Sequence, residues 1–152
     1  ELYGFVAHRA EALARSPNLP KIAFVARPKD YTASTGRRIT AQEIDLLGRG
    51  LSGQKLHKAF AVTGAICTGA AARIPGTVVN EVCTAPPEQL PVRIGHPAGI
   101  FTLEIRVEER NGELVLTRAA LERTARRIMD GYVYVPRSKV PALARLQAAG
   151  AR

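Results

Sequence analysis

The sequence predicts an α+β domain in which a helix of small residues is enclosed by other structure, a composition that a helix threaded through a curled sheet would need, and two patterns carry this prediction. Residues 101–108 alternate strictly between apolar and polar side chains, and Asn111-Gly112 supplies a two-residue hairpin turn before a return strand at 113–117. Residues 59–73 are mostly Ala, Gly and Thr, so a helix there lacks a polar face and needs other structure on most of its sides.

Length and composition favour one globular domain with a real core. The chain has 152 residues, of which 46% are hydrophobic, and it contains no apolar run of about 20 residues that predicts a transmembrane helix. Its two cysteines, Cys67 and Cys83, make neither a disulfide framework nor a zinc site. Cys67 lies among small residues, which favours a buried core position. Reduced thiols indicate a cytoplasmic protein.

The formal net charge of +9 does not by itself identify a partner. Basic residues are scattered along the chain, and with four Phe, four Tyr and no Trp there is no evident base-stacking platform. We therefore expect no nucleic-acid and no membrane partner. Two interpretations stay open, a solvated basic surface and a site for anionic metabolites.

The remaining segments give local predictions of secondary structure. At 121–129 the apolar spacing favours a helix, although the hairpin before it and the run 132–135 favour strands. The other expectations are a helix over 2–15, a buried strand over 21–26, a loop over 27–36, a three-turn helix after the capping box Thr40-Ala41-Gln42-Glu43 reaching Leu51, an extended segment at 77–79 and a terminal helix over 140–149.

The entry to the small-residue helix is the first candidate binding site. His57 lies there between Lys55 and Lys58, and the first turn of a helix offers unpaired N–H groups and a positive dipole end that suit a carboxylate. The alternative is an ordinary basic helix entry. His8, in the predicted first helix, has no assigned role.

The turn Gly95-His96-Pro97-Ala98-Gly99 is the second candidate. Its glycines permit positive φ angles, and the N–H groups of Ala98 and Gly99 form a possible anion nest. His96 either hydrogen-bonds a ligand oxygen or caps the turn. We recognise no nucleophile triad, metal cluster or dinucleotide fingerprint, so neither a metal nor an organic cofactor is expected.

Several motifs occurring in one order resemble the C-terminal half of the 2-methylaconitate isomerase and 4-oxalomesaconate tautomerase family. They are Lys21-Ile22-Ala23-Phe24-Val25, Asp45-Leu46-Leu47, Lys55-Leu56-His57, the run from Ile74 to Asn80, the turn Gly95–Gly99 and the run from Arg123 to Pro136. The resemblance implies the diaminopimelate-epimerase-like fold, with a curled, mostly antiparallel sheet around a central helix. It also implies that 121–129 is a strand. On this basis residues 1–152 form one domain, with a core at 21–136 and a tail at 137–152.

The resemblance implies a cofactor-independent isomerase that shifts a double bond in unsaturated di- or tricarboxylates. Lys55, His57, His96, Ala98 and Gly99 would face the substrate. The main catalytic residues would belong to an N-terminal domain that this chain lacks, so we expect the chain alone to be inactive and to self-associate through the exposed cleft wall. Ala98 stands where the family usually has Ser, which removes a possible hydrogen bond. The alternative is a non-catalytic anion- or protein-binding module derived from that family.

Overall fold

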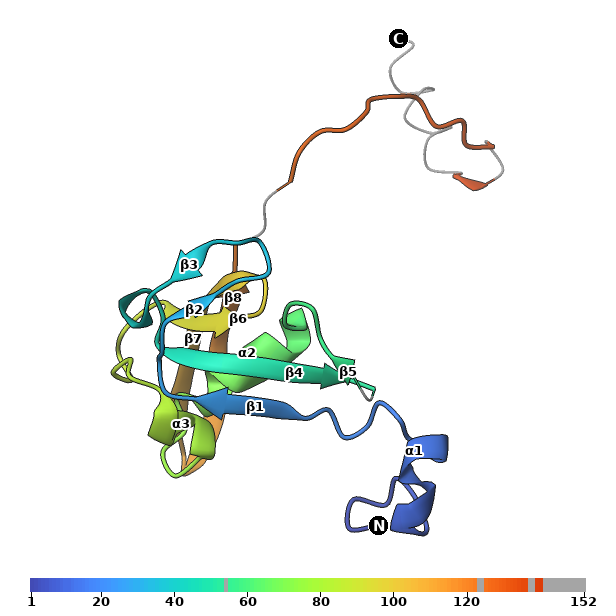
Figure 1. Ribbon diagram of the computed structural model, residues 1–152. Helices are drawn as coiled ribbons and strands as arrows, with labels where there is room; N and C mark the ends of the chain where they lie inside the picture. Colours follow the sequence, from blue (N-terminus) through green and yellow to red (C-terminus); the bar gives the residue numbers. More distant parts are fainter. Residues whose placement is uncertain (54, 123–124, 137–138, 141–152) are drawn as a thin grey trace. The chain divides into compact units, whose positions relative to one another are not determined.

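A mixed sheet with the strand order β1-β4-β6-β7-β8 organises the first of two units, residues 1–122; residues 123–152 form the second. The computed structural model describes residues 1–53, 55–122, 125–136 and 139–140. Figure 1 shows the strands of the sheet, which are β1 (Ala23–Ala26), β4 (Leu46–Ser52), β6 (Val92–His96), β7 (Gly99–Arg110) and β8 (Glu113–Leu121). All neighbours pair antiparallel except β4 and β6.

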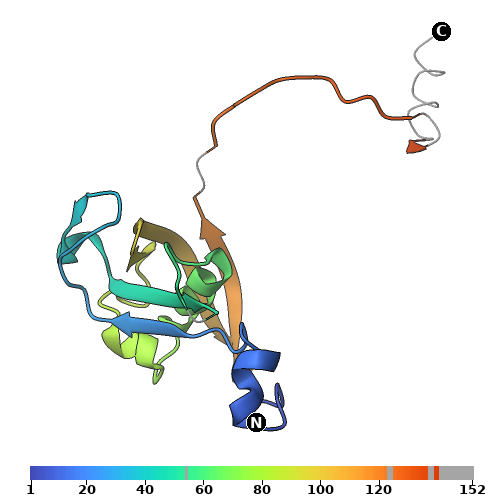
Figure 2. The same cartoon turned by 45° about the vertical axis from the view of Figure 1, so that its right-hand side comes forward.

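The parallel pair β4 and β6 is joined by a crossover that contains the helices. A parallel connection needs a long crossover, and here it comprises β5 (Lys55–Leu56), which pairs back onto β4, then α2 (Val62–Ala71) and α3 (Val78–Val82). The sheet curls about α2, which lies between β4 and the long β7–β8 hairpin in Figure 2. This is the predicted arrangement of a sheet around a helix of small residues.

Close approach between α2 and the sheet explains the small residues of the helix. Ala65, Thr68 and Gly69 form its buried face, and they pack with Phe60 against buried side chains of β4, β6 and β7. A Cβ atom on Gly69 would lie 3.0 Å from Ile105 Cγ1, closer than ordinary van der Waals contact. The main core is therefore made by the inner side of the sheet and one face of α2.

A smaller core lies under a second, two-stranded sheet. Strands β2 (Tyr31–Thr32) and β3 (Arg38–Ile39) pair antiparallel, and Ala33, Ile39 and Ile44 pack there against the partly buried Tyr31, Leu47 and Ile100. These strands fall in and after the segment predicted to be a loop. The small core brings Tyr31 to the turn between β6 and β7.

The helix predicted after the capping box is wrong, because residues 46–52 form strand β4. Glu43 does accept a hydrogen bond from the Thr40 backbone N–H at 2.8 Å, but the box closes only the 3-10 turn η2 (Ala41–Glu43). Phe60 explains the strand: its ring packs over Gly48 and Gly50, where a Cβ would lie 3.2 and 3.4 Å from Phe60 Cε2. Glycine is also a poor residue for a helix interior.

Other predictions near the helices also need correction. The first helix is limited to η1 (Arg9–Glu11) and α1 (Ala12–Arg15), since few residues there are buried and short helices are marginal without packing. Residues 78–82 form α3 instead of an extended segment, because the Thr77 side chain caps the helix by accepting from Asn80 N–H at 3.1 Å. Strand β1 is an edge strand with Phe24 exposed, not a buried one.

The predicted hairpin is confirmed, whereas the predictions for the segment after it are wrong. Asn111 and Gly112 both adopt positive φ, as the predicted turn requires, and β8 extends to Leu121. Residues 125–129 are neither helix nor strand, so both expectations for them fail; within the described part of their own unit they have no partner strand. The terminal helix expected at 140–149 lies outside the described residues beyond Val140.

The described helices include none with the length and apolar character needed to cross a bilayer.

Two glycines of α2 give a matched test of this packing. Gly64→Ala should raise the free energy of unfolding by about 0.5–1 kcal/mol, because its Cβ would meet nothing closer than 3.7 Å and Ala is the better helix former. The Gly69→Ala protein should have a free energy of unfolding about 1–3 kcal/mol lower than that of the Gly64→Ala protein, because Ile105 must move to make room for the new Cβ. Urea unfolding measures both values. Equal effects would show that α2 does not pack closely on β7.

Candidate functional site

The turn between β6 and β7 is a tight hairpin that presents His96 at the end of the sheet. His96 pairs with Gly99 across the turn, and Pro97 and Ala98 occupy its two corners. Gly99 has a φ of +152°, a conformation that L side chains rarely adopt, so glycine is needed at this position. The turn is therefore fixed by its sequence as well as by its neighbours.

The imidazole of His96 is held as a neutral hydrogen-bond donor. The side chain is 7% exposed, its ring lies 4.9 Å from that of Phe101, and its Nδ1 accepts a hydrogen bond from Ala98 N–H at 3.3 Å. Burial lowers the pKa of His96, and the nearby charges of Arg49 and His57 lower it further. With Nδ1 accepting, the ring proton lies on Nε2.

The Nε2 atom of His96 is available to a ligand. It has no hydrogen-bond partner among the described residues. It is also not fully buried, because it is absent from the fully buried side-chain atoms that lack a partner in that part of the chain. What little surface His96 exposes therefore includes this atom. A neutral Nε2–H that reaches the surface suits a carboxylate oxygen.

Tyr31 locks the turn from the neighbouring small sheet. Its hydroxyl lies 3.0 Å from the carbonyl oxygen of His96 and 2.6 Å from that of Gly99, and its single proton is shared between these two acceptors. Burial raises the pKa of Tyr31, so the phenol stays protonated at neutral pH. A Cβ at Gly95 would lie 2.8 Å from Ile44 Cδ1 and 3.1 Å from the Tyr31 hydroxyl oxygen, which explains why glycine precedes His96.

His57 repeats the hydrogen-bonding pattern of His96 before α2. Its Nδ1 accepts from Ala59 N–H at 3.0 Å, while its own backbone N–H donates to the Gly50 carbonyl at 2.8 Å. The half-buried ring lines a cavity of about 370 Å³ bounded by β1, β4 and α2. Polar side chains around this cavity are Lys21, Ser52, Thr63, Cys67 and Thr68.

Cys67 was expected in the core, but it is exposed. Thr63 and Cys67 lie on the face of α2 that borders the cavity beside β1 and β4, where both side chains are exposed. The small size of the helical residues around Cys67 reflects the packing of the other face and says nothing about this one. Within the described residues, α2 is thus enclosed on fewer sides than its composition predicts.

The predicted site residues fall into three positions. His57 and His96 come within electrostatic range of each other, and Ala98 and Gly99 complete the turn. Lys55 is exposed on β5 and forms no ion pair with a described residue. The Ala98 N–H already donates to His96, so the expected nest of two free N–H groups is not open in this form.

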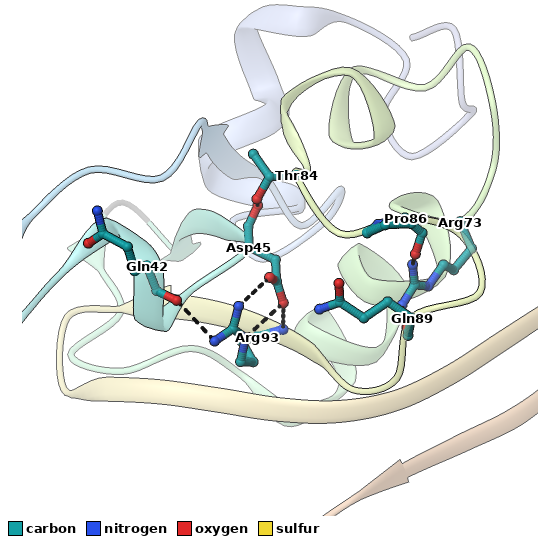
Figure 3. A network of polar contacts seen from close by, with 7 residues as sticks. All are labelled: Gln42, Asp45, Arg73, Thr84, Pro86, Gln89 and Arg93. Carbon is teal, nitrogen blue, oxygen red and sulfur yellow. Dashed lines mark hydrogen bonds and ion pairs between the residues drawn. The ribbon is translucent and has the colours of Figure 1, made fainter.

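Two buried polar contacts support the elements that carry the turn, as Figure 3 shows. Asp45 precedes β4 and accepts from Arg93 of β6, with 2.7 Å both to the backbone N–H and to Nη2. Arg73, beyond α2, donates to the Pro86 and Gln89 carbonyls and so fixes the loop before β6. The parallel register of β4 and β6 is therefore tied by side chains as well as by the backbone.

Sequence reasoning missed two residues beside the turn, Tyr31 and Arg49. The Arg49 guanidinium stacks over the Tyr31 ring at 5.0 Å and donates to the Gly95 carbonyl at 3.0 Å. No local pattern marks either residue. The one available signal is a tyrosine inside a polar stretch, at position 31.

The described residues contain no group of three or more His, Cys, Asp or Glu side chains arranged to hold a metal ion. The chemistry open to this site is hydrogen bonding and charge stabilisation of an anion by imidazole N–H groups and nearby cations.

Comparison with known proteins identifies the family. A family model described as PrpF protein matches residues 1–136. The chain belongs to this family. The 3-methylitaconate isomerase of Eubacterium barkeri is 48% identical over 138 residues, which are 90% of this chain and 35% of that protein. The 2-methyl-aconitate isomerase of Shewanella oneidensis is 43% identical over 134 residues, 88% of this chain and 33% of the relative.

A solved structure confirms the fold of this PrpF-family chain. The crystal structure of methylitaconate-delta-isomerase superposes with a TM-score of 0.71 at 46% sequence identity, and the match covers 90% of this chain and 34% of that one. The expected diaminopimelate-epimerase-like fold is thereby confirmed. The chain spans about a third of the length of the relatives it matches.

Proposed function

We propose that this chain forms a substrate-binding domain of a cofactor-independent isomerase that shifts a double bond in unsaturated di- or tricarboxylates. The observation that carries the proposal is the neutral His96 imidazole, which presents Nε2–H at a rigid turn in a chain of the PrpF family. Relatives are named for isomerisation of methylitaconate and methyl-aconitate, which are carboxylates of this class.

The proposed reaction is a proton shift between allylic carbons. A base removes a proton from one carbon, the electron pair spreads through the double bond toward a carboxylate, and an acid returns a proton to the other carbon. Negative charge grows on the carboxylate oxygens in between. Hydrogen-bond donors fixed before the reaction stabilise that charge without reorganising, and His96 and His57 are placed to be such donors.

The proton-transferring groups would come from a companion N-terminal domain. In this proposal residues 1–152 correspond to the C-terminal domain of a two-domain protein, with its core at 21–136, acting in the cytoplasm. The full-length protein is then this chain joined to that companion. The chain alone would be inactive and would self-associate through surface that the companion covers, which includes apolar side chains such as Ile22 and Leu56, 51% and 54% exposed.

Ala98 would leave substrate contact at the turn to the His96 ring. A serine hydroxyl at this position would add one donor, whereas Ala98 offers a methyl group, and its N–H already donates to His96. We therefore expect the turn to bind a carboxylate through His96 Nε2–H. The proposed substrate-facing residues are Lys55, His57, His96, Ala98 and Gly99, of which His57 and His96 supply the ring donors and Lys55 is exposed.

An NMR titration tests whether the half-site recognises carboxylates. In protein with labelled histidine rings and backbone, aconitate should shift the His57 and His96 ring signals and the Gly99 amide, while inorganic phosphate at the same concentration should shift them less. The exposed His8 serves as the internal control. Equal shifts with both anions, or shifts at His8 alone, would contradict the proposed site.

A further inference from the structure

Arg49 lies beside the candidate site on β4, on the face that carries Tyr31. Its two neighbours in the strand, Gly48 and Gly50, would direct a Cβ toward Phe60, so alternation along the strand turns Arg49 to the opposite face. There its guanidinium lies over the Tyr31 ring, 5.0 Å from the ring centre. Tyr31 in turn contacts the carbonyls of His96 and Gly99.

The guanidinium of Arg49 is held in place through one of its nitrogens. Nη1 donates to the carbonyl of Gly48 at 2.8 Å and to that of Gly95 at 3.0 Å, which accounts for both of its hydrogens. Nε–H and the Nη2 amino group have no partner among the described residues, and neither is a fully buried atom. Three donors of a fixed, half-buried guanidinium thus remain available.

Arg49 also lacks the carboxylate partner that several other arginines have. Arg93, Arg37, Arg38 and Arg118 each pair with a carboxylate, whereas Arg49 forms no ion pair with a described residue. The carboxylate of Glu43, which lies near Tyr31, is already engaged by Arg37 and Thr40. A cation that is positioned by carbonyls and stacked on an aromatic ring, but left without an anion, is prepared to bind one.

We propose that Arg49 binds a carboxylate of the substrate beside the His96 turn, through its Nε–H and Nη2–H groups. The assignment rests on the proposed function and deepens it, because it names the element that selects di- and tricarboxylates over monocarboxylates. The His96 ring lies with Phe101 on one face of the sheet, and Arg49 lies with Tyr31 on the other, but β6 ends at His96. A substrate bound across this end of the sheet would place one carboxylate on His96 and another in a charge-assisted fork on Arg49. A substrate with one carboxylate would leave Arg49 unpaired.

The proposal makes Tyr31 a positioning residue with two contacts. Its ring supports the guanidinium, and its hydroxyl holds the turn. The positive charge near the turn comes from Arg49 on β4, while Arg37 and Glu43 lie near Tyr31 and pair with each other. The local balance at the turn therefore favours an anion.

The test compares binding of aconitate and of the monocarboxylate crotonate to the full-length protein by calorimetry. Arg49→Gln should weaken aconitate binding by about tenfold or more, as expected for loss of a charge-assisted hydrogen bond, and should leave crotonate binding nearly unchanged. Arg49→Lys keeps the charge and a donor for the Gly95 carbonyl, so its aconitate affinity should lie between those of the unsubstituted protein and Arg49→Gln. Arg38→Gln is the matched control, since Arg38 is exposed and pairs with Asp30.

Each outcome decides a separate question. Selective loss of aconitate binding in Arg49→Gln, with Arg38→Gln unaffected, supports the assignment. Normal aconitate binding in Arg49→Gln, or an equal loss for both acids, overturns it and leaves the proposed function in place. No aconitate binding by the unsubstituted protein would overturn both. If Arg49→Gln fails to fold, the 15N signals of the Arg49 guanidinium in the unsubstituted protein decide: they shift on addition of aconitate, or the assignment fails.

Discussion

Replacing His96 by Ala in the full-length protein is expected to lower the turnover number for isomerisation by about 100-fold. The magnitude is that of losing one fixed donor aimed at developing negative charge. His96 qualifies because Ala98 N–H holds its Nδ1, and because burial and nearby charge keep its pKa low, so a neutral ring offers Nε2–H. Initial rates with a methylaconitate-like acid give the turnover number and KM separately.

Two controls make the His96 result specific. His8→Ala removes an exposed imidazole in the N-terminal segment and should leave turnover unchanged. His96→Gln retains a side-chain N–H donor and should recover part of the lost rate. An unchanged turnover number in a folded His96→Ala protein would show that this imidazole does not act on the reaction.

Asp45→Asn is expected to lower the free energy of unfolding by about 2 kcal/mol, because the Arg93 guanidinium, 34% exposed, loses the buried carboxylate that balances its charge. The Asp45 side chain is 4% exposed and accepts from both the backbone and the guanidinium of Arg93. Urea unfolding followed by circular dichroism measures the change.

The matched control for Asp45→Asn is Glu104→Gln, which breaks the pair with Arg118 on the exposed side of the hairpin. This pair is open to solvent at both partners, so its loss should cost about 0–1 kcal/mol. Similar values for the two variants would mean that the contact between Asp45 and Arg93 does not hold β4 against β6.

The β7–β8 hairpin and α2 were predictable because their signals are local. Alternation along β7, the Asn111-Gly112 turn and the small residues of α2 each specify their own segment. Strand β4 was not predictable, because the need for glycine at 48 and 50 arises from the packing of Phe60 over the strand, which the sequence does not show. The capping box was recognised correctly, but it closes a single turn.

Some residues of the candidate site also have local signals in the sequence, and others do not. His96 lies in a glycine-rich turn and His57 precedes a helix, so both stand out in the sequence. Tyr31 and Arg49 act through carbonyls 46 to 68 positions away, a separation that no periodicity reveals. Cys67 was placed in the core from its small neighbours, although its exposure depends on which face of α2 meets the sheet.

The most direct test of the proposed function is isomerisation of unsaturated di- and tricarboxylates by the full-length protein in deuterated water. An allylic proton shift predicts that the double bond moves and that solvent deuterium enters at the carbon that gains hydrogen, both visible by NMR of the product. The rate should depend on His96. If a folded protein binds these acids but leaves their double bonds and allylic hydrogens unchanged across such a panel, then this chain belongs to a binding module and not to an isomerase.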